Sequence, residues 1–513
     1  MEYFSLNSVD GVPSFKVTPT VQQALLVTKE KSGVTTLYVA KTEVQETSVL
    51  DYLNAFREIH PDAKIQYIDK SELIPLQDRS GILGGDENKS EIQKQVIDIF
   101  RAAVQRRATD IHFILKDDFT VVKFRIDKVL TKYREYSAEE GQAHVFALYQ
   151  TMCEGNSKQT FSMQSPVEAN IDEKYVKELG LNGGRLASRP TDQRVVVVVR
   201  LLRKKSRAFT LQELGMSQKQ IDIINRVSDI PSGVVFFSGP TNSGKSTLAQ
   251  SILESVAAAN PGDHLITVED PIENLIRGAV QTPLIVADRS QPGIMDRAFA
   301  DAIANLVRMD PDQLFVGEVR ETQSAVGCIS AAQTGRKVWT TIHTYYPIDI
   351  IARLKALNVD ADLITDSTLI VCLIGQRTTP LLCEHCKISY EKSKNSLREA
   401  DRNLIEQYCD IDNVYLPNEE GCEECDFTGH HGMSGIFEII ETDADFMRVY
   451  HEQGKMKAYE HWYVNGGMTL CSSLVRLVNA GKVNPLYAHR SICNLDRDER
   501  MFTQEIRNSR KEH

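Results

Sequence analysis

The sequence predicts a multidomain protein of the α/β class, on three observations. Its 513 residues give room for roughly three or four domains with buried cores of their own. From residue 207 onward, strand-like and helix-like segments alternate, which is the order that forms a parallel sheet with helices on both faces. Inside that alternation, a glycine-rich loop at 239–247 separates the apolar run 234–237 from a helix-like run. We therefore expect a parallel-sheet core preceded by smaller domains.

Residues 1–75 are expected to form a small N-terminal α+β domain. Strand-like segments at 24–30, 35–40 and 64–69 accompany a helical pattern at about 43–58. No pattern in this domain indicates chemistry, and its residues alone do not indicate a function. Within the family resemblance described below, it is the candidate for docking to other cytoplasmic components.

A flexible linker is expected at 76–90, where Gly, Asp, Asn and Ser are frequent and no hydrophobic period persists. A second α+β domain is expected at 91–205. It begins with a helical pattern at about 91–107 and ends with the strand-like run 195–202. The parallel-sheet core follows it, at 206–377.

The loop GPTNSGKST fits the pattern G-x-x-x-x-G-K-[ST], whose small residues let backbone N–H groups curl around a phosphate at a helix N-terminus. Lys245 is expected to neutralise phosphate charge, Ser246 to ligate Mg²⁺, and Thr247 to support the turn or contact the α-phosphate. Asn242 suits a loop of this kind, because Asn tolerates positive φ. The alternative is a glycine-rich turn without nucleotide, but the flanking strand and helix are the context that the motif requires. The residues expected at the nucleotide are Gly239, Pro240, Thr241, Asn242, Ser243, Gly244, Lys245, Ser246 and Thr247.

Hydrolysis needs a carboxylate that orients water at the end of a neighbouring strand. Glu318 follows the apolar run 314–316 and is the candidate, although a solvated Glu after a core strand is the common alternative. Glu269, in the acidic stretch TVEDPIE, is expected to support the metal or the water, because buried acids need a cation or a partner. His343 ends another strand-like run, where it could contact phosphate; a lone histidine there is otherwise structural.

Two C-x-x-C pairs bracket 35 residues, and four thiolates so arranged suit a tetrahedral Zn²⁺. The ligands are expected to be Cys383, Cys386, Cys422 and Cys425, with His385 between ligands and not one of them. The alternatives are a redox dithiol or plain buried thiols, and two matched pairs favour one shared site. Such a zinc site is structural, because four cysteines leave no open coordination position.

The motifs occur in a characteristic order. GPTNSGKST, TVEDPIE, RMDPDQLFVGEVRE and TTIHT resemble the Walker A, Asp box, Walker B and His box of the secretion ATPase superfamily, which powers type II secretion and type IV pili. ATDIHF, FRID, LGMS and GQR extend the resemblance over about 91–490. The resemblance implies a RecA-like P-loop ATPase core, a PAS-like domain ahead of it and a homohexameric ring that uses ATP and Mg²⁺.

The same resemblance implies that the domain ahead of the core closes over the nucleotide and contributes arginines. Arg125, Arg185 and Arg200 match by position, although a surface ion pair is the alternative for each. The sequence departs from the family pattern where Lys128 follows FRID in place of Gly, and Gly317 stands where many such enzymes have Asp. Further departures are Arg336 in place of His and Ala304 in place of Arg.

GCEECDFTGHHGMSGIFE is similar to the tetracysteine segment of the assembly and secretion branch of this family. The resemblance therefore implies a tetracysteine zinc module, expected at 378–432, and extension of a filament rather than its retraction. A helical region is expected at 433–513, with a charged solvated helix or tail from 495 onward.

Composition favours a cytoplasmic protein. The longest apolar run, 195–199, is too short to cross a bilayer, and the N-terminus lacks a basic start followed by an apolar core. A net charge of −11 argues against a chain that coats nucleic acid. Together with the resemblance, this predicts an ATPase that powers assembly of a type IV pilus or a type II secretion pseudopilus. It would associate peripherally with the inner membrane through a platform protein and act indirectly on pilin or pseudopilin.

Two other functions stay open at this point. A conjugative, DNA-uptake or type IV secretion motor would keep the ATPase and change the cargo. A zinc-stabilised nucleotide-binding scaffold would bind nucleotide with little turnover. Stimulation by DNA would favour the first, and normal behaviour after loss of Glu318 would favour the second.

Overall fold

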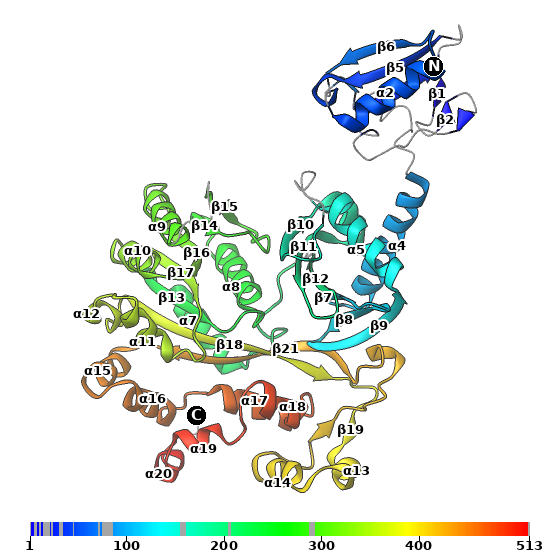
Figure 1. Ribbon diagram of the computed structural model, residues 1–513. Coiled ribbons are helices and arrows are strands. Elements are labelled where there is room, and N and C mark those ends of the chain that lie inside the picture. The colour runs from blue at the N-terminus through cyan, green and yellow to red at the C-terminus, as the bar shows by residue number, and fades with distance from the viewer. Residues whose placement is uncertain are drawn as a thin grey trace.

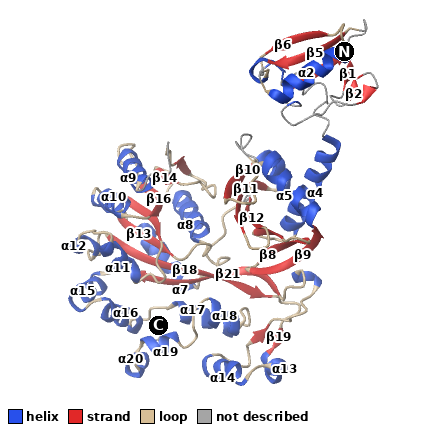
Figure 2. Ribbon diagram, in the orientation of Figure 1, coloured by secondary structure: helices blue, strands red, loops and turns tan. Residues whose placement is uncertain are grey.

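The computed structural model shows how these segments assemble (Figures 1 and 2). The residues that it describes are 2–4, 8–9, 12–13, 21, 24–29, 34–44, 46–69, 72–73, 86–153, 161–203, 207–286 and 293–510. Within them the chain forms sheets of four, six and seven strands, each packed against helices. No helix of this described part is long and apolar enough to cross a membrane.

The four-stranded sheet near the N-terminus has the strand order β1-β4-β5-β6. Helix α2 (Thr47–Ile59) covers it because its apolar residues recur at helical spacing, which buries Val49, Tyr52, Leu53 and Phe56. β5 and β6 pair in parallel and the other strands pair antiparallel. The strands are β1 (Glu2–Phe4), β4 (Leu25–Lys29), β5 (Thr35–Ala40) and β6 (Lys64–Ile68), with a separate pair β2 (Ser8–Val9) and β3 (Val12–Pro13).

The six-stranded sheet is antiparallel, with the order β10-β11-β12-β7-β8-β9. Its core combines α4, α5 and the inward residues of the central strands, among them Phe100, Phe113 and Val197. The elements are α4 (Asp86–Gln105), β7 (Asp110–Leu115), β8 (Phe119–Ile126), β9 (Val129–Ser137), α5 (Ala138–Met152), β10 (Val167–Ile171), α6 (Glu173–Val176), β11 (Leu181–Pro190) and β12 (Val195–Arg203).

Helix α4 begins at Asp86, so the last five positions of the linker expected at 76–90 are helical. Residues 86–105 contain neither Gly nor Pro, so no helix-breaking residue prevents the helix from starting at Asp86. The rest of the expected linker lies outside the described residues.

The seven-stranded sheet has the order β15-β14-β16-β17-β13-β18-β21 and is parallel except at the β18–β21 pair. Every residue of β13 is buried, and its side chains alternate between two cores: Val234 and Phe236 face one, Val235 and Phe237 the other. Its elements are α7 (Gln218–Asp229), β13 (Gly233–Ser238), α8 (Lys245–Ala259), β14 (Leu265–Glu269), β15 (Ala279–Pro283), α9 (Ile294–Leu306), β16 (Gln313–Val319), α10 (Thr322–Gln333), β17 (Lys337–Ile342), α11 (Asp349–Ala356), α12 (Ala361–Ile364), β18 (Ile370–Leu382) and β21 (His430–Glu441). The predicted multidomain α/β fold with a parallel-sheet core is confirmed.

The long β18–β21 pair changes how the later part of the chain is divided. The boundaries expected at 377/378 and 432/433 both fall inside these strands. Residues between the two strands form a small excursion from the core sheet, drawn in yellow to orange at the bottom of Figure 1. Its elements are β19 (Ile388–Ser389), α13 (Tyr390–Ser393), α14 (Glu399–Tyr408) and β20 (Tyr415–Leu416). Local patterns could not show this, because the two strands are far apart in sequence and each is completed by the other.

Short helices follow β21. They are α15 (Ala444–Gln453), α16 (Lys455–Val464), α17 (Leu470–Asn479), α18 (Pro485–Ser491), α19 (Arg497–Met501) and α20 (Gln504–Asn508). The expectation of a solvated helix or tail from 495 onward is wrong for 495–502, where Leu495, Arg497 and Phe502 are buried, whereas α20 buries no residue. The buried Arg497 is paired: its Nη1 lies 3.2 Å from Oδ1 of Asp498 and 3.9 Å from Oε2 of the buried Glu438, and its guanidinium also stacks on Tyr346 at 4.1 Å from the ring centroid.

Candidate functional site

The phosphate-binding loop joins the buried strand β13 to helix α8. Three of its residues take positive φ: Gly239 (153°), Asn242 (63°) and Gly244 (90°). At Gly244 the positive φ favours glycine, and an added Cβ would also lie 2.8 Å from Nε2 at the end of the Gln376 side chain, which would have to move. The expectation that Asn242 accepts positive φ is confirmed. The loop thus carries the curled backbone and helix N-terminus that suit an anion.

Lys245, the first residue of α8, is folded back over the loop. Its Nζ donates to the carbonyl oxygens of Gly239 at 2.8 Å and Pro240 at 3.2 Å. Burial lowers the pKa of Lys245 to about 8, although Glu318 opposes this shift. Because removal from water disfavours its charge, the ammonium group has a strong electrostatic reason to pair with an anion.

Glu318 is held by two basic side chains. It lies in β16, and His343 follows the adjacent parallel strand β17. His343 Nε2 lies 2.9 Å from Oε1 of Glu318, while Arg320 Nε donates to Oε2 at 2.8 Å. His343 is therefore placed to orient the carboxylate. Sequence reasoning missed Arg320, which directly follows the last residue of β16.

Glu269 ends β14 and is buried. Its Oε1 accepts hydrogen bonds from Thr267 Oγ1 and Gln281 Nε2, both at 2.8 Å. Burial raises the pKa of Glu269, and these two hydrogen bonds oppose the rise. Gly317 abuts this residue: an added Cβ would lie 3.2 Å from the Cα of Glu269. Glycine at 317 leaves room for this close approach of the two strand ends.

The three predicted arginines lie in one row across the six-stranded sheet. Strand register pairs Arg185 with Arg200, Arg200 with Asp110, and Asp110 with Arg125. Directly paired residues point to the same face of a sheet, so all four side chains share one face. Arg200 Nε lies 3.1 Å from Oδ1 of the buried Asp110, which fixes the guanidinium of Arg200. Asp110 was not predicted as a site residue, although it lies within the motif ATDIHF.

A cavity of about 640 Å³ joins the two halves of the site. On one side lie the phosphate-binding loop from 241 to 247 and the acids Glu269 and Glu318; on the other lie Arg185 and Arg200. Thr109, Arg203, Arg320 and His343 also line it. Gly239 and Pro240 take part only through the carbonyls that hold Lys245. The predicted groups from distant parts of the chain are thus brought around one space.

Arg125 is not brought there. It does not belong to the described residues that line the cavity, and its Nη1 donates to the carbonyl of Lys128 at 3.0 Å. That Arg125 contacts the nucleotide therefore stays a prediction. Its strand carries it to the far end of the row.

The family profile described as "Type II/IV secretion system protein" matches residues 86–500, which is most of the chain. The chain belongs to this family. Similar proteins include type II secretion system ATPase E of Vibrio cholerae, 29% identical over 383 residues, which are 73% of this chain and 70% of that protein. Type IV pilus assembly ATPase PilB of Thermus thermophilus is 31% identical over 366 residues, which are 69% of this chain and 38% of PilB. The resemblance to secretion ATPases that the motifs indicate is confirmed.

Solved structures support the fold. The ATPase DotB of Legionella pneumophila superposes with a TM-score of 0.51 at 18% identity, covering 74% of this chain and 90% of that chain. DotB of Yersinia pseudotuberculosis gives a TM-score of 0.52, also at 18% identity, covering 77% and 92%. At this identity the likeness concerns the fold alone.

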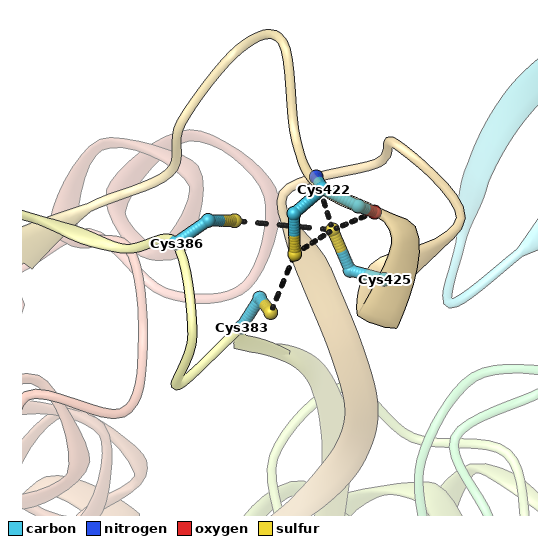
Figure 3. A group of neighbouring side chains, drawn as sticks. All are labelled: Cys383, Cys386, Cys422 and Cys425. Carbon is cyan, nitrogen blue, oxygen red and sulfur yellow. Dashed lines mark hydrogen bonds between the residues drawn. The ribbon is translucent and has the colours of Figure 1, made fainter.

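The four predicted cysteines come together, from the end of β18 and the approach to β21 (Figure 3). Their sulfur atoms all lie within 4.8 Å of one another, with 3.8 Å from Cys383 to Cys422 and 3.9 Å from Cys386 to Cys425. Four thiolates around a tetrahedral zinc ion, each about 2.3 Å from it, would be about 3.8 Å apart. The predicted tetracysteine cluster is confirmed, and its geometry suits zinc.

The thiolate form of Cys425 is favoured by its hydrogen-bond donors. Burial raises the pKa of its thiol, but backbone N–H groups of Cys422 and Gly429 donate to its Sγ at 3.2 and 3.3 Å, and the net effect lowers it to about 7. Metal ligation requires the thiolate, so these N–H groups favour the state that binds metal.

Proposed function

We propose that this protein is a Mg²⁺-dependent ATPase whose turnover drives assembly of a type IV pilus or a type II secretion pseudopilus. The observation that carries the proposal is the shared cavity, in which Lys245, Ser246 and Glu318 face Arg185 and Arg200. A phosphate-binding loop, a carboxylate beside it and arginines opposite are the groups that phosphoryl transfer to water requires. Membership of the type II/IV secretion family supports the proposal that ATP hydrolysis drives assembly of a filament.

In the proposed reaction the loop backbone and Lys245 bind the phosphates of ATP, and Ser246 offers a hydroxyl to Mg²⁺. The metal, when bound, neutralises charge on the transferring phosphoryl group. Glu318 orients or deprotonates the attacking water, with its carboxylate directed by His343 and Arg320. Glu269, at the end of β14, accepts hydrogen bonds from Thr267 and Gln281. In the proposed reaction its carboxylate supports either the attacking water or the water shell of the metal.

Arginines supply the step that couples chemistry to motion. Arg200, fixed by Asp110, stabilises charge on the transferring group. Because Arg200 lies in the six-stranded sheet and the phosphates bind at the seven-stranded one, the site is complete only when the two sheets approach. Closure on ATP and opening after release therefore move one sheet against the other.

We place this cycle in a homohexameric ring in the cytoplasm, associated peripherally with the inner membrane. The force passes to a membrane platform protein and through it to pilin or pseudopilin subunits, and the N-terminal four-stranded unit docks to other components. The proposed domains are 1–75, 91–205, a core that begins at 206 and includes all of β18 and β21, the zinc module between these two strands, and the helices that follow β21. The motifs and the strand bounds support this division.

The test is filament assembly in cells. Cells whose own copy is replaced by a Lys245→Ala variant are expected to make no surface filaments or secreted cargo, while pilin or pseudopilin accumulates in the membrane. A rival motor for nucleic acid is favoured by no contact described above, and it would be revealed by DNA-stimulated ATP hydrolysis. Normal filaments on Lys245→Ala cells would overturn the proposal.

The cysteine cluster is expected to hold about one zinc ion per chain as a structural site. Changing Cys422 to Ser should lower the zinc content about tenfold or more and make the excursion between β18 and β21 unfold at lower temperature, because ligand loss removes metal-coupled folding free energy. Metal analysis and thermal denaturation measure this. The matched control is Cys409→Ser, a half-buried thiol of the same excursion outside the cluster. Equal zinc in both variants would show that the cluster is not the metal site.

A further inference from the structure

The turn between β8 and β9 consists of two residues, Asp127 and Lys128. Both take positive φ, 44° and 68°. Two-residue hairpin loops with positive φ at both positions strongly prefer Asn-Gly or Asp-Gly, because a side chain in the second position is strained. A lysine is therefore an unfavourable choice for the turn itself. Such an outlier is explained when the strained side chain makes a contact that glycine could not make.

Lys128 makes a contact of this kind with the other sheet. Its Nζ donates to the carbonyl oxygen of Thr378 in β18, at 2.6 Å. Burial of the amine lowers the pKa of Lys128 to about 8, and the nearby Arg377 adds to the shift. Burying an ammonium group is unfavourable unless it has a hydrogen-bond acceptor, and the Thr378 carbonyl is the acceptor here.

Thr378 connects this contact to the phosphate-binding loop. Its Oγ1 donates to the carbonyl of Asn242 at 3.4 Å, and its methyl group lies 3.3 Å from where a Cβ on Gly244 would be. Two hydrogen bonds, from Lys128 to Thr378 and from Thr378 to Asn242, thus connect Lys128 to the phosphate-binding loop. Neither of them involves the nucleotide.

Asp127 makes the second contact across the sheets. Its Oδ2 accepts a hydrogen bond from the backbone N–H of Gly432 in β21, at 3.0 Å, and lies 3.6 Å from Nη2 of Arg107. The side chain of Asp127 is only 9% exposed. The two residues of the turn therefore contact the β18–β21 pair, Lys128 through β18 and Asp127 through β21.

The turn also ends the arginine row. Arg125 donates to the carbonyl of Lys128, and strand register continues from Arg125 through Asp110 to Arg200. The row of paired residues thus has the β8–β9 turn at one end and Arg200, which lines the cavity, toward the other.

We propose that Asp127 and Lys128 form a latch that holds the six-stranded sheet on the β18–β21 pair and so sets how closely Arg200 approaches the phosphate-binding loop. Asp127 and Lys128 are positioning residues in this assignment, and they touch neither nucleotide nor metal. The proposal rests on the proposed function for its consequence, the affinity for ATP, but its contacts are independent of catalysis.

The test compares Lys128→Gly and Asp127→Ala with the unchanged chain. Binding of a fluorescent ATP analogue with Mg²⁺ is expected to weaken about 5- to 20-fold in each, because the arginine-engaged arrangement becomes a smaller fraction of the population. In a chain that also carries Arg200→Ala, the latch changes should make less than a twofold difference, since no arginine remains to be positioned. Lys128→Gly also relieves the strained turn, so loss of folding does not explain its effect.

Hydrogen exchange gives a readout that needs no turnover. Asp127→Ala is expected to speed exchange in the peptide containing Gly432 about tenfold, because that amide loses its acceptor. Lys132→Ala is the control: Lys132 lies on β9 close to the turn and pairs with the exposed Glu135, and neither binding nor exchange should change. Binding within twofold of the unchanged chain, or an equal loss in the Arg200→Ala background, would overturn the latch. Absence of nucleotide binding in every protein would overturn the proposed function instead, and the latch would then stand or fall on the exchange result.

Discussion

Changing Glu318 to Gln is expected to lower kcat for ATP hydrolysis by about 10²- to 10⁴-fold while ATP still binds, since this is the range that a positioned general base contributes. The amide keeps the size of the side chain but cannot accept a proton from water. His343 and Arg320 both face this carboxylate, so the replacement removes the group on which the local geometry converges. Phosphate release and binding of a labelled ATP analogue measure the two effects separately.

The matched control is Glu321→Gln, an exposed acid three residues further along the chain. It should leave kcat within about twofold, as is usual for surface substitutions away from a site. Equal turnover in the Glu318→Gln and unchanged proteins would favour the scaffold function over the enzyme. Loss of ATP binding in Glu318→Gln would show instead that the side chain is needed to form the site.

Changing Arg200 to Ala is expected to lower kcat on the order of 10³-fold, the lower end of what an arginine that faces the transferring phosphoryl group contributes. Arg200 lines the cavity opposite the phosphate-binding loop and is fixed by Asp110. Arg200→Lys should recover little of this loss, because an ammonium group cannot reproduce the planar fork that guanidinium presents to phosphate. Steady-state kinetics across ATP concentrations separate kcat from KM.

Arg125→Ala provides the comparison within the same row. Because its guanidinium serves the β8–β9 turn, we expect a loss in kcat under about tenfold, with the larger change in KM. A greater loss of kcat in Arg125→Ala than in Arg200→Ala would mean that the nucleotide meets the row at its other end. The pair of variants therefore tests the geometry as well as the chemistry.

Local chemistry made the loop and the metal cluster predictable. Asn242 could be assigned a left-handed conformation from residue type alone, and the two C-x-x-C pairs each fix two sulfurs through a short backbone loop. Glu318 could be proposed because an acid after a buried strand must lie at the sheet edge where other strands also end. In each case a few consecutive residues carry the signal.

The features that depend on strand register and on pairing between distant segments could not be predicted from the sequence. Asp110 orients Arg200 only because β7 and β12 pair with these residues opposite each other, and no local pattern states that pairing. The β18–β21 pair likewise depends on segments separated by the cysteine cluster, so the expected boundaries fell within strands. Arg125 was assigned to the nucleotide by resemblance, and the width of the sheet carries it away from the cavity.

Phosphate release from ATP by the purified, zinc-loaded chain, with and without Mg²⁺, tests the central claim most directly. The account predicts release that saturates with ATP, requires Mg²⁺ and disappears in Glu318→Gln. Release no greater than that of Glu318→Gln, in a protein that binds ATP and carries its zinc, would contradict it.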